Sequence, residues 1–363
     1  MFLSKDSAAS GNPRRGLCLI TALSAALLAA ALALSGCDTG GGTYTPPVDP
    51  LTKWQAVAAV PFSNEVYAVA YGNGRFVAGG SDGTGAYSFD GAVWASLDGT
   101  ATTFGTDAIS SIKFLNGKFW AVGGNGKIAA STTGISWDAV TQTEITGRIR
   151  DIAYGAGKYV AVGEAGMMVY SSDGAAWTAN DQTGIFKHSG NTAVNINSIV
   201  YAAGKFVAVG QSGTAAVSGD GVYWINVGPG ENVGTHALFG NTNSGSNGIK
   251  MVAYGNGIFV AAGQAKVAKS ADGIIWTKVD LQSLLGIPGN TSWLNCVTFV
   301  DGRFVAGGGS GQAVYSVNGQ NWTKIAQTGP IFGTGQFINS IAYGVERFVA
   351  VGGGSNRIAY TVP

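Results

Sequence analysis

Hydrophobic runs separated by glycine turns recur along most of the chain. The first block is Val69-Ala-Tyr-Gly-Asn-Gly-Arg-Phe-Val-Ala-Gly79, and six further copies begin at Ile112, Ile152, Ile199, Val252, Val297 and Ile341. Asn-Gly between two apolar runs favours a type I′ hairpin turn, which needs positive φ at both central residues. The run after the turn is apolar without alternation, which is typical of a strand buried on both faces. Each block therefore predicts two strands of a sheet, the second of them fully buried.

A second block follows six of the seven copies. It reads Ser-x-Asp-Gly-x-x-Trp or a close variant, at Ser88–Trp94, Ser131–Trp137, Ser171–Trp177, Ser218–Trp224, Ser270–Trp276 and Ser316–Trp322. Its Asp-Gly pair predicts another hairpin, so each unit has four strands. Successive tryptophans lie 40 to 52 residues apart, and four antiparallel strands at this period indicate a propeller blade.

The seventh copy ends the chain without a fourth strand. It runs to Pro363 with no second block, whereas Lys53-Trp54-Gln-Ala-Val57 precedes the first copy. A blade completed by both ends of the chain closes the ring and leaves no open sheet edge. The sequence therefore predicts an all-β, seven-bladed β-propeller of four-stranded antiparallel blades over residues 53–363, closed by pairing of its N-terminal and C-terminal strands.

The Ser-x-Asp-Gly-x-x-Trp block resembles the Asp-box of bacterial neuraminidase-like (BNR) repeats, a family of propellers that includes sialidases, photosystem II assembly factors and bacterial lipoproteins. In such a turn the Asp or Asn side chain accepts hydrogen bonds from its own backbone, so the motif is structural. Thr133 departs from the pattern, and no Asp-x-Asp-x-Asp cluster of the kind that binds calcium is present. The matching positions are Asp90, Asp173, Asp220 and Asp272, with Asn318 as a near match.

The first 36 residues read as an export signal. Lys5, Arg14 and Arg15 precede an apolar run that ends in Leu34-Ser-Gly-Cys37. The run is long enough for an anchor helix, but its last four residues resemble the lipobox of bacterial lipoproteins. That resemblance implies a signal peptide over 1–36, an acylated Cys37 as mature N-terminus, and a Gly/Thr/Pro-rich tether over 37–52. We expect a protein of the bacterial cell envelope, anchored by lipid to the inner or outer membrane.

Charge and cysteine content argue against several classes of partner and active site. Only 11% of residues are charged, and no basic stripe is present, so nucleic acid is not an expected partner. Most charges fall on turns and loops, which predicts neither a charged groove nor a crowded acid/base site. Cys296 lies in an alternating strand pattern, so we expect a buried thiol. No haem motif or phosphate loop occurs, and the sequence predicts no cofactor.

The candidate site residues lie in the connections between blades. Arg148 and Arg150 are two residues apart at a strand start, so they project to one face and are the only arginine pair worth testing for a sialidase-like site. His188 and His236 lie in the longest connections, 181–195 and 228–248. The two histidines could bind one metal ion together, but we favour the interpretation that they are ordinary polar residues of the loops, and we predict no metal site.

In a propeller these connections share one face, where apolar loop residues either bind a ligand or fold down over the channel. The candidate binding face comprises His188, His236, Phe239, Trp293, Phe332, Arg148 and Arg150. We therefore expect a non-enzymatic binding module for a protein or glycan. The alternative is a glycan hydrolase or lyase on the same scaffold, for which the sequence supplies no complete set of catalytic residues.

Overall fold

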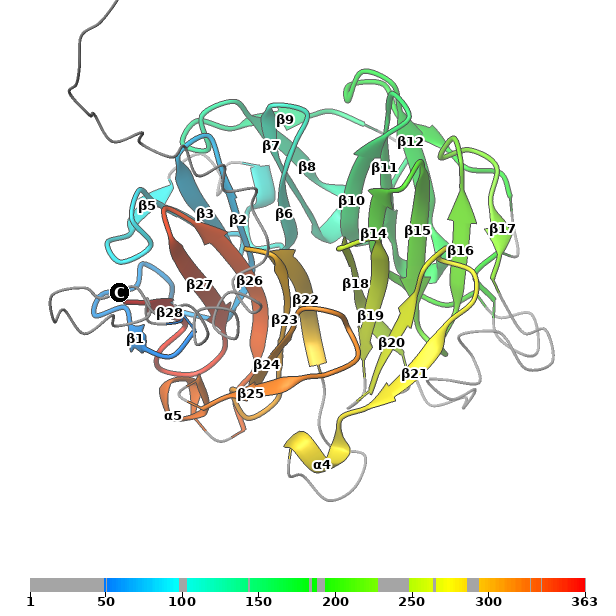
Figure 1. Ribbon diagram of the computed structural model, residues 1–363. Helices are drawn as coiled ribbons and strands as arrows, with labels where there is room; N and C mark the ends of the chain where they lie inside the picture. The colour runs from blue at the N-terminus through cyan, green and yellow to red at the C-terminus, as the bar shows by residue number, and fades with distance from the viewer. Residues whose placement is uncertain are drawn as a thin grey trace, which may run out of the picture. The chain divides into compact units, whose positions relative to one another are not determined.

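The computed structural model describes residues 49, 51–97, 103–142, 144–182, 185–187, 193–227, 248–263, 266–285, 294–326, 328–333 and 335–362. Residues Val48–Pro363 form one compact unit. Within the described ranges, seven four-stranded antiparallel sheets are arranged around a common centre (Figure 1), and their innermost strands line a central channel. The predicted seven-bladed propeller is confirmed. The signal segment, Cys37 and most of the tether lie outside the described residues.

Each blade contributes one strand to the channel wall, and three more strands follow outward. The inner strands are β2 (Val66–Gly72), β6 (Ile109–Leu115), β10 (Ile149–Gly155), β14 (Ile196–Ala202), β18 (Ile249–Gly255), β22 (Leu294–Val300) and β26 (Ile338–Gly344). The second strands are β3 (Arg75–Gly80), β7 (Lys118–Gly123), β11 (Lys158–Gly163), β15 (Lys205–Gly210), β19 (Ile258–Gly263), β23 (Arg303–Gly308) and β27 (Arg347–Gly352).

The outer half of each blade is shorter. The third strands are β4 (Gly85–Ser88), β8 (Ile128–Ser131), β12 (Met168–Ser171), β16 (Ala215–Ser218), β20 (Lys266–Ser270), β24 (Ala313–Ser316) and β28 (Ile358–Thr361). The fourth strands are β5 (Ala95–Leu97), β9 (Asp138–Val140), β13 (Thr178–Ala179), β17 (Ile225–Asn226), β21 (Thr277–Asp280), β25 (Thr323–Ile325) and β1 (Trp54–Ala56). Two short helices, α4 (Gln282–Leu285) and α5 (Thr328–Phe332), lie in connections between blades.

The ring closes through the two ends of the propeller chain. Strand β1 pairs antiparallel with β28, with Trp54 opposite Thr361 and Ala56 opposite Ala359. The backbone N–H of Val362 also donates to the carbonyl oxygen of Lys53 at 3.0 Å. The last blade therefore receives its fourth strand from the N-terminal side, as the sequence predicts, and this edge is paired.

The hairpin turns between the first two strands have the backbone that their sequences predict. Asn73 and Gly74 both have positive φ, 46° and 75°. In the last blade Val345 and Glu346 take φ of 44° and 60° with no glycine present. An L-residue in this region costs roughly 1–2 kcal/mol, so this turn is strained relative to its counterparts.

The Ser-x-Asp-Gly turns share one hydrogen-bond pattern. Asp90 Oδ1 accepts from the N–H groups of Ala92 and Val93, both at 2.9 Å, and Trp94 Nε1 donates to the Gly91 carbonyl at 2.9 Å. The same bonds recur at Asp173, Asp220, Asp272 and Asn318. We call Asp90, Asp173, Asp220 and Asp272 the turn aspartates.

The variant turn at Thr133 is weaker than the others. Its hydroxyl accepts from the N–H groups of Ile135 and Ser136 at the longer distances of 3.2 and 3.3 Å. The indole Nε1 of Trp137, which closes this turn, is buried without a hydrogen-bond partner among the described residues. The aspartate therefore contributes to the geometry of the whole turn and not only to its first two N–H groups.

Hydrophobic side chains pack between neighbouring blades. The second strands are buried along almost their whole length, and Phe76, Phe206, Phe259, Phe304 and Phe348 are fully buried there. Cys296 in β22 is 1% exposed, and burial raises the pKa of its thiol to about 12, against a lowering by a backbone hydrogen bond of Gly307. The expected burial of this thiol is confirmed, and the thiolate needed for nucleophilic chemistry is disfavoured.

Candidate functional site: the central channel

The two faces of the propeller are built from different loops. Inner strands begin at one face, which also holds the inter-blade connections and the turns between second and third strands; we call it the mouth face. Inner strands end at the opposite face, where their hairpin turns contact the Ser-x-Asp-Gly turns of a neighbouring blade. Asn73 Nδ2, for example, donates to the Thr132 carbonyl at 3.0 Å, and Arg347 Nη1 donates to the Asp90 carbonyl at 3.1 Å. We call this second face the turn face.

A β-bulge occurs at the start of every inner strand. The register with the second strand shifts between the first and third residues, so the second residue has no direct partner. A bulge redirects the side chain that it carries. All seven bulged residues are polar and line the channel: Tyr67, Ser110, Arg150, Asn197, Lys250, Asn295 and Asn339. We call them the bulge ring.

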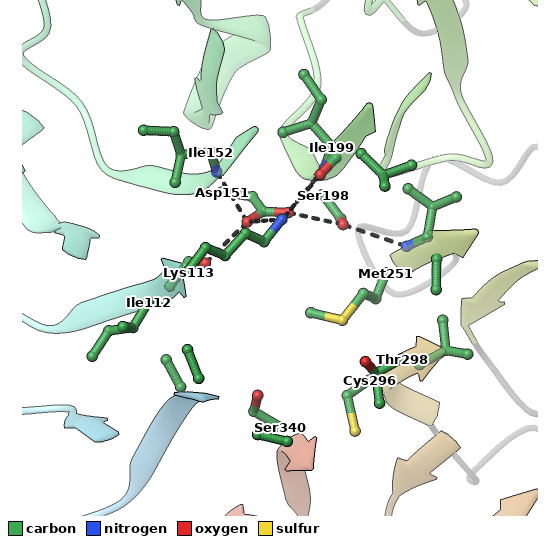
Figure 2. A pocket seen from close by; sticks show the side chains of 18 of the residues that line it. Ile112, Lys113, Asp151, Ile152, Ser198, Ile199, Met251, Cys296, Thr298 and Ser340 are labelled. Carbon is green, nitrogen blue, oxygen red and sulfur yellow. Dashed lines mark hydrogen bonds and ion pairs between the residues drawn. The ribbon is translucent and has the colours of Figure 1, made fainter. Parts of the chain in front are cut away.

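The channel holds a cavity of about 750 Å³ whose wall comes from all seven inner strands. Figure 2 looks into it, with side chains such as Lys113, Met251 and Ser340 arranged around the space. This volume lies within the range of pockets that hold small ligands, roughly 300–1,000 Å³. Toward the turn face the wall becomes aromatic, through Tyr71, Phe114, Tyr154, Tyr201, Tyr254, Phe299 and Tyr343.

These aromatic rings also join neighbouring blades. A Cβ atom added at Gly155 would overlap the ring of Tyr201 in the next inner strand, and Gly255 stands in the same relation to Phe299. Glycine is therefore required at these positions for the close approach of one blade to the next. The aromatic end of the channel is consequently rigid.

Three basic side chains gather at the mouth end of the cavity. Arg148, Arg150 and Lys250 all line it, and Arg150 Nη2 lies 3.2 Å from Glu164 Oε1. Burial lowers the pKa of the Arg150 guanidinium, Glu164 opposes that shift, and Arg148 adds to it. Burial and then the charge of Arg150 lower the pKa of Lys250. The three cations are therefore close enough to repel one another in a partly dehydrated site.

The tyrosine of the bulge ring belongs to the same electrostatic environment. Burial and the nearby Glu65 raise the pKa of the Tyr67 hydroxyl, while Arg148 lowers it. Tyr67 therefore stays protonated near neutral pH, and because its O–H is engaged by Glu65, its oxygen offers an acceptor to a ligand.

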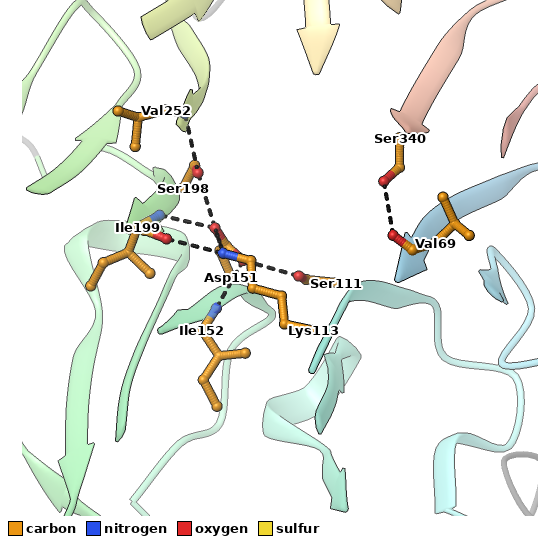
Figure 3. Close-up of polar contacts among 9 residues, drawn as sticks. All are labelled: Val69, Ser111, Lys113, Asp151, Ile152, Ser198, Ile199, Val252 and Ser340. Atoms are coloured by element: carbon orange, nitrogen blue, oxygen red, sulfur yellow. Dashed lines mark hydrogen bonds and ion pairs between the residues drawn. The ribbon is translucent and has the colours of Figure 1, made fainter. Parts of the chain in front are cut away.

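A buried carboxylate connects three inner strands below the mouth (Figure 3). The Asp151 side chain is 2% exposed and lies 2.8 Å from Lys113 Nζ. It accepts from the hydroxyls of Ser111 and Ser198 and from the N–H groups of Ile152 and Ile199, all at 2.9 Å. Since these five donors occupy both oxygens, Asp151 is a structural acceptor that ties β6, β10 and β14 together.

Two buried polar atoms on the cavity wall remain unsatisfied. Among the described residues, neither Ser110 Oγ nor Arg150 Nε has a hydrogen-bond partner. Both belong to the bulge ring. Buried donors without partners are rare in proteins, so these two atoms mark a place where a bound group would gain hydrogen bonds.

Of the seven predicted site residues, two line the cavity, one is buried in the blade packing, and four lie outside the described residues. Arg148 and Arg150 lie together at the mouth end of the cavity. Phe332 is 2% exposed, because α5 packs it against Leu51 and Trp54 beside β1, so it is not an exposed member of the binding face. His188, His236, Phe239 and Trp293 lie outside the described residues.

The prediction that no charged groove exists was wrong. Lys113 and Asp151 were missed because each occurs once, in inner strands whose other copies carry small or apolar residues at that position. Lys250 was missed because it occupies the bulged position, which is polar in every copy. Within the described ranges, no group of three or more His, Cys, Asp or Glu side chains could hold a metal ion. No helix there is long and apolar enough to cross a bilayer.

Comparisons with known proteins agree with the fold. Residues 46–187 match the model of the DUF6242 beta propeller domain, and no curated protein matches the chain.

Three solved structures are similar to this chain. YCF48 from Cyanidioschyzon merolae has a TM-score of 0.61 at 14% identity, covering 85% of this chain and 98% of its own. A structure of YCF48 bound to D1 peptide has a TM-score of 0.60 at 14% identity, covering 85% and 96%. The computationally designed Ika8 protein has a TM-score of 0.53 at 11% identity, covering 85% and 100%. At these identities the likeness concerns the fold alone. The chain is therefore a seven-bladed β-propeller whose N-terminal part is similar to the DUF6242 propeller domain.

Proposed function

We propose that this chain is a non-enzymatic binding module of the bacterial envelope, anchored by lipid at Cys37, which binds a protein partner through its mouth face. The observation that carries this proposal is the cavity of about 750 Å³ with a complete ring of polar side chains at its mouth end. The inner strands begin at the same face, so the described ends of the inter-blade connections lie there as well. A rigid scaffold that presents loops and a polar pocket at one face suits recognition.

The comparisons support a protein partner in one respect. YCF48, a propeller of similar fold, has been solved bound to a peptide. The catalytic alternative receives less support from the cavity. Its buried carboxylate, Asp151, is engaged by five donors, whereas a general acid or base must reach the proton that it transfers.

The tether contacts the propeller at the turn face, opposite the mouth face, which is consistent with a lipid anchor on that side. Both carboxylate oxygens of Asp49 lie 3.0 Å from Nη1 of Arg303, which begins β23 at the turn face. The thirteen residues from Cys37 to Asp49 span at most ~40 Å when extended. A tether that joins the propeller at the turn face leaves the mouth face accessible to a partner.

Two experiments test the proposal. Cys37→Ala should move the protein from the membrane fraction to the soluble fraction, and its persistence in membranes would contradict lipid anchoring. The tagged full-length protein, extracted from source envelopes in mild detergent, should retain a protein partner that protease treatment removes. Recovery of glycans alone, with no protease-sensitive partner, would contradict the choice of partner.

A further inference from the structure

We infer that the mouth of the channel is a carboxylate-binding site, in which Arg148, Arg150 and Lys250 hold acidic groups of the ligand. This inference rests on the proposed function and names the chemistry of the ligand. It assigns the cavity to a compound or protein segment that presents carboxylates to the mouth face.

The cavity wall carries more basic than acidic side chains. Among the described residues, the basic residues Lys113, Arg148, Arg150 and Lys250 line the cavity, against one acidic residue, Asp151. Lys113 and Asp151 form an internal ion pair at 2.8 Å. The other three basic side chains lie at the mouth.

The guanidinium of Arg150 has donor capacity beyond its contact with Glu164. Glu164 contacts this guanidinium through Nη2 only, at 3.2 Å, and the Glu164 side chain is 42% exposed. The Nε atom points to no partner among the described residues. A guanidinium offers paired N–H groups that match a carboxylate, and the Glu164 contact uses one edge of this fork.

Arg150 is repelled by both of its cationic neighbours. Arg148 and Lys250 each interact electrostatically with Arg150, and burial disfavours the charged forms of Arg150 and Lys250. Holding three cations in a partly dehydrated mouth costs free energy unless anions accompany them. A bound carboxylate would offset that cost and would also satisfy the Ser110 hydroxyl.

The charge balance favours carboxylates over phosphate dianions. Glu65 lies close enough to Tyr67 to raise its pKa, and Glu164 contacts Arg150, so acidic side chains already stand beside these cations. A group with one negative charge is repelled less by these acids than a phosphate dianion. Polar neighbours such as the Tyr67 hydroxyl can bind the remainder of the ligand.

The test measures binding of defined probes to the detergent-solubilised full-length protein by titration calorimetry. Succinate represents a free small carboxylate and tetraglutamate represents an acidic protein segment, while tetraglutamine is the neutral control and inorganic phosphate the competing anion. We expect at least one carboxylate probe to bind more tightly than both tetraglutamine and phosphate. A preference for tetraglutamate over succinate indicates a protein segment, and the reverse preference indicates a small molecule.

Matched variants locate the site. Arg148→Gln and Lys250→Gln should each weaken binding of the carboxylate probe by about tenfold, the loss of roughly one charge-assisted contact. Lys118→Gln removes the same charge from an exposed position at the turn face and should leave binding unchanged. Equal melting temperatures show that the variants are folded. Any of three results would overturn the inference. Both mouth variants could keep full affinity, neither carboxylate probe could bind, or phosphate could bind more tightly than the carboxylate probes.

The failure of this inference and of the proposed function can be told apart. If the double variant Arg148→Gln/Lys250→Gln binds the carboxylate probes as tightly as the wild type, while the wild type retains its protein partner from envelope extracts, the carboxylate site is refuted and the binding function stands. If the wild-type protein retains no partner but binds tetraglutamate, the site stands and the proposed function fails.

Discussion

Removal of the Asp151 carboxylate tests how the channel wall is held together. The side chain accepts five hydrogen bonds from three adjacent inner strands, two of them from backbone N–H groups at sheet edges that face the channel. Asp151→Ala leaves these donors without their acceptor and leaves Lys113 as an uncompensated, 29% exposed cation. Since partial exposure reduces the penalty on the lysine, we expect a loss of about 3–5 kcal/mol of unfolding free energy.

This loss can be expressed as a melting temperature. With an unfolding entropy of ~2.1 cal/mol/K per residue and a propeller of about 310 residues, 1 kcal/mol corresponds to roughly 1.5 °C. Asp151→Ala should therefore lower the melting temperature by about 5–8 °C in scanning calorimetry, checked against urea unfolding at 25 °C.

A companion variant distinguishes the roles of the two charges. Lys113→Met removes the cation but leaves Asp151 with four donors, two hydroxyls and two N–H groups. It should therefore cost only about 1 kcal/mol. A loss below 1 kcal/mol for Asp151→Ala, or an equal loss for both variants, would refute the view that Asp151 organises the wall.

Three further predictions concern the repeated turns and the blade contacts. Glu346→Gly should raise unfolding free energy by about 1 kcal/mol, because glycine accepts the φ of 60° without strain; a lower melting temperature would contradict this. Gly155→Ala should destabilise more than Gly157→Ala, although only Gly157 has positive φ, because the new methyl group meets the Tyr201 ring while Gly157 faces open space. The reverse order in thermal melting would show that blade spacing can relax. At the turn aspartates, burial acts to raise the carboxyl pKa, but hydrogen bonds to the carboxylate outweigh it and lower the pKa below its usual value. The stability that these carboxylates contribute is therefore full above about pH 4 and is lost as pH falls through the lowered pKa. Replacing all four with Asn, the residue found in the turn at Asn318, should reduce the fall in melting temperature between about pH 5 and pH 3. An unchanged fall over this range would show that other groups cause it.

The fold could be predicted because its determinants are local and repeated. Asn73-Gly74 and its counterparts specify the same hairpin in each blade, and the missing fourth strand after Tyr360 matches the surplus strand at Trp54. Each of these signals depends on a few adjacent residues. Seven copies of one pattern then leave little choice of architecture.

The channel chemistry could not be predicted in the same way. The side chains of Lys113 and Asp151 meet only because β6 and β10 become neighbours in the ring, and a bulge at the start of each inner strand alters the simple alternation of faces. Phe332 was misplaced for a related reason. A short helix forms in its connection and turns the side chain toward β1, which the loop composition does not reveal.

The most direct test of the account asks which face meets the partner in the intact envelope. A photo-crosslinking phenylalanine analogue replaces either Tyr67, in the bulge ring at the mouth, or Tyr223, which is 73% exposed at the turn face. Both changes keep an aromatic ring, so the two proteins differ chiefly in the face that carries the probe. Irradiation should give a discrete protein adduct from position 67 and none from position 223. An adduct from position 223 alone would contradict binding at the mouth of the channel.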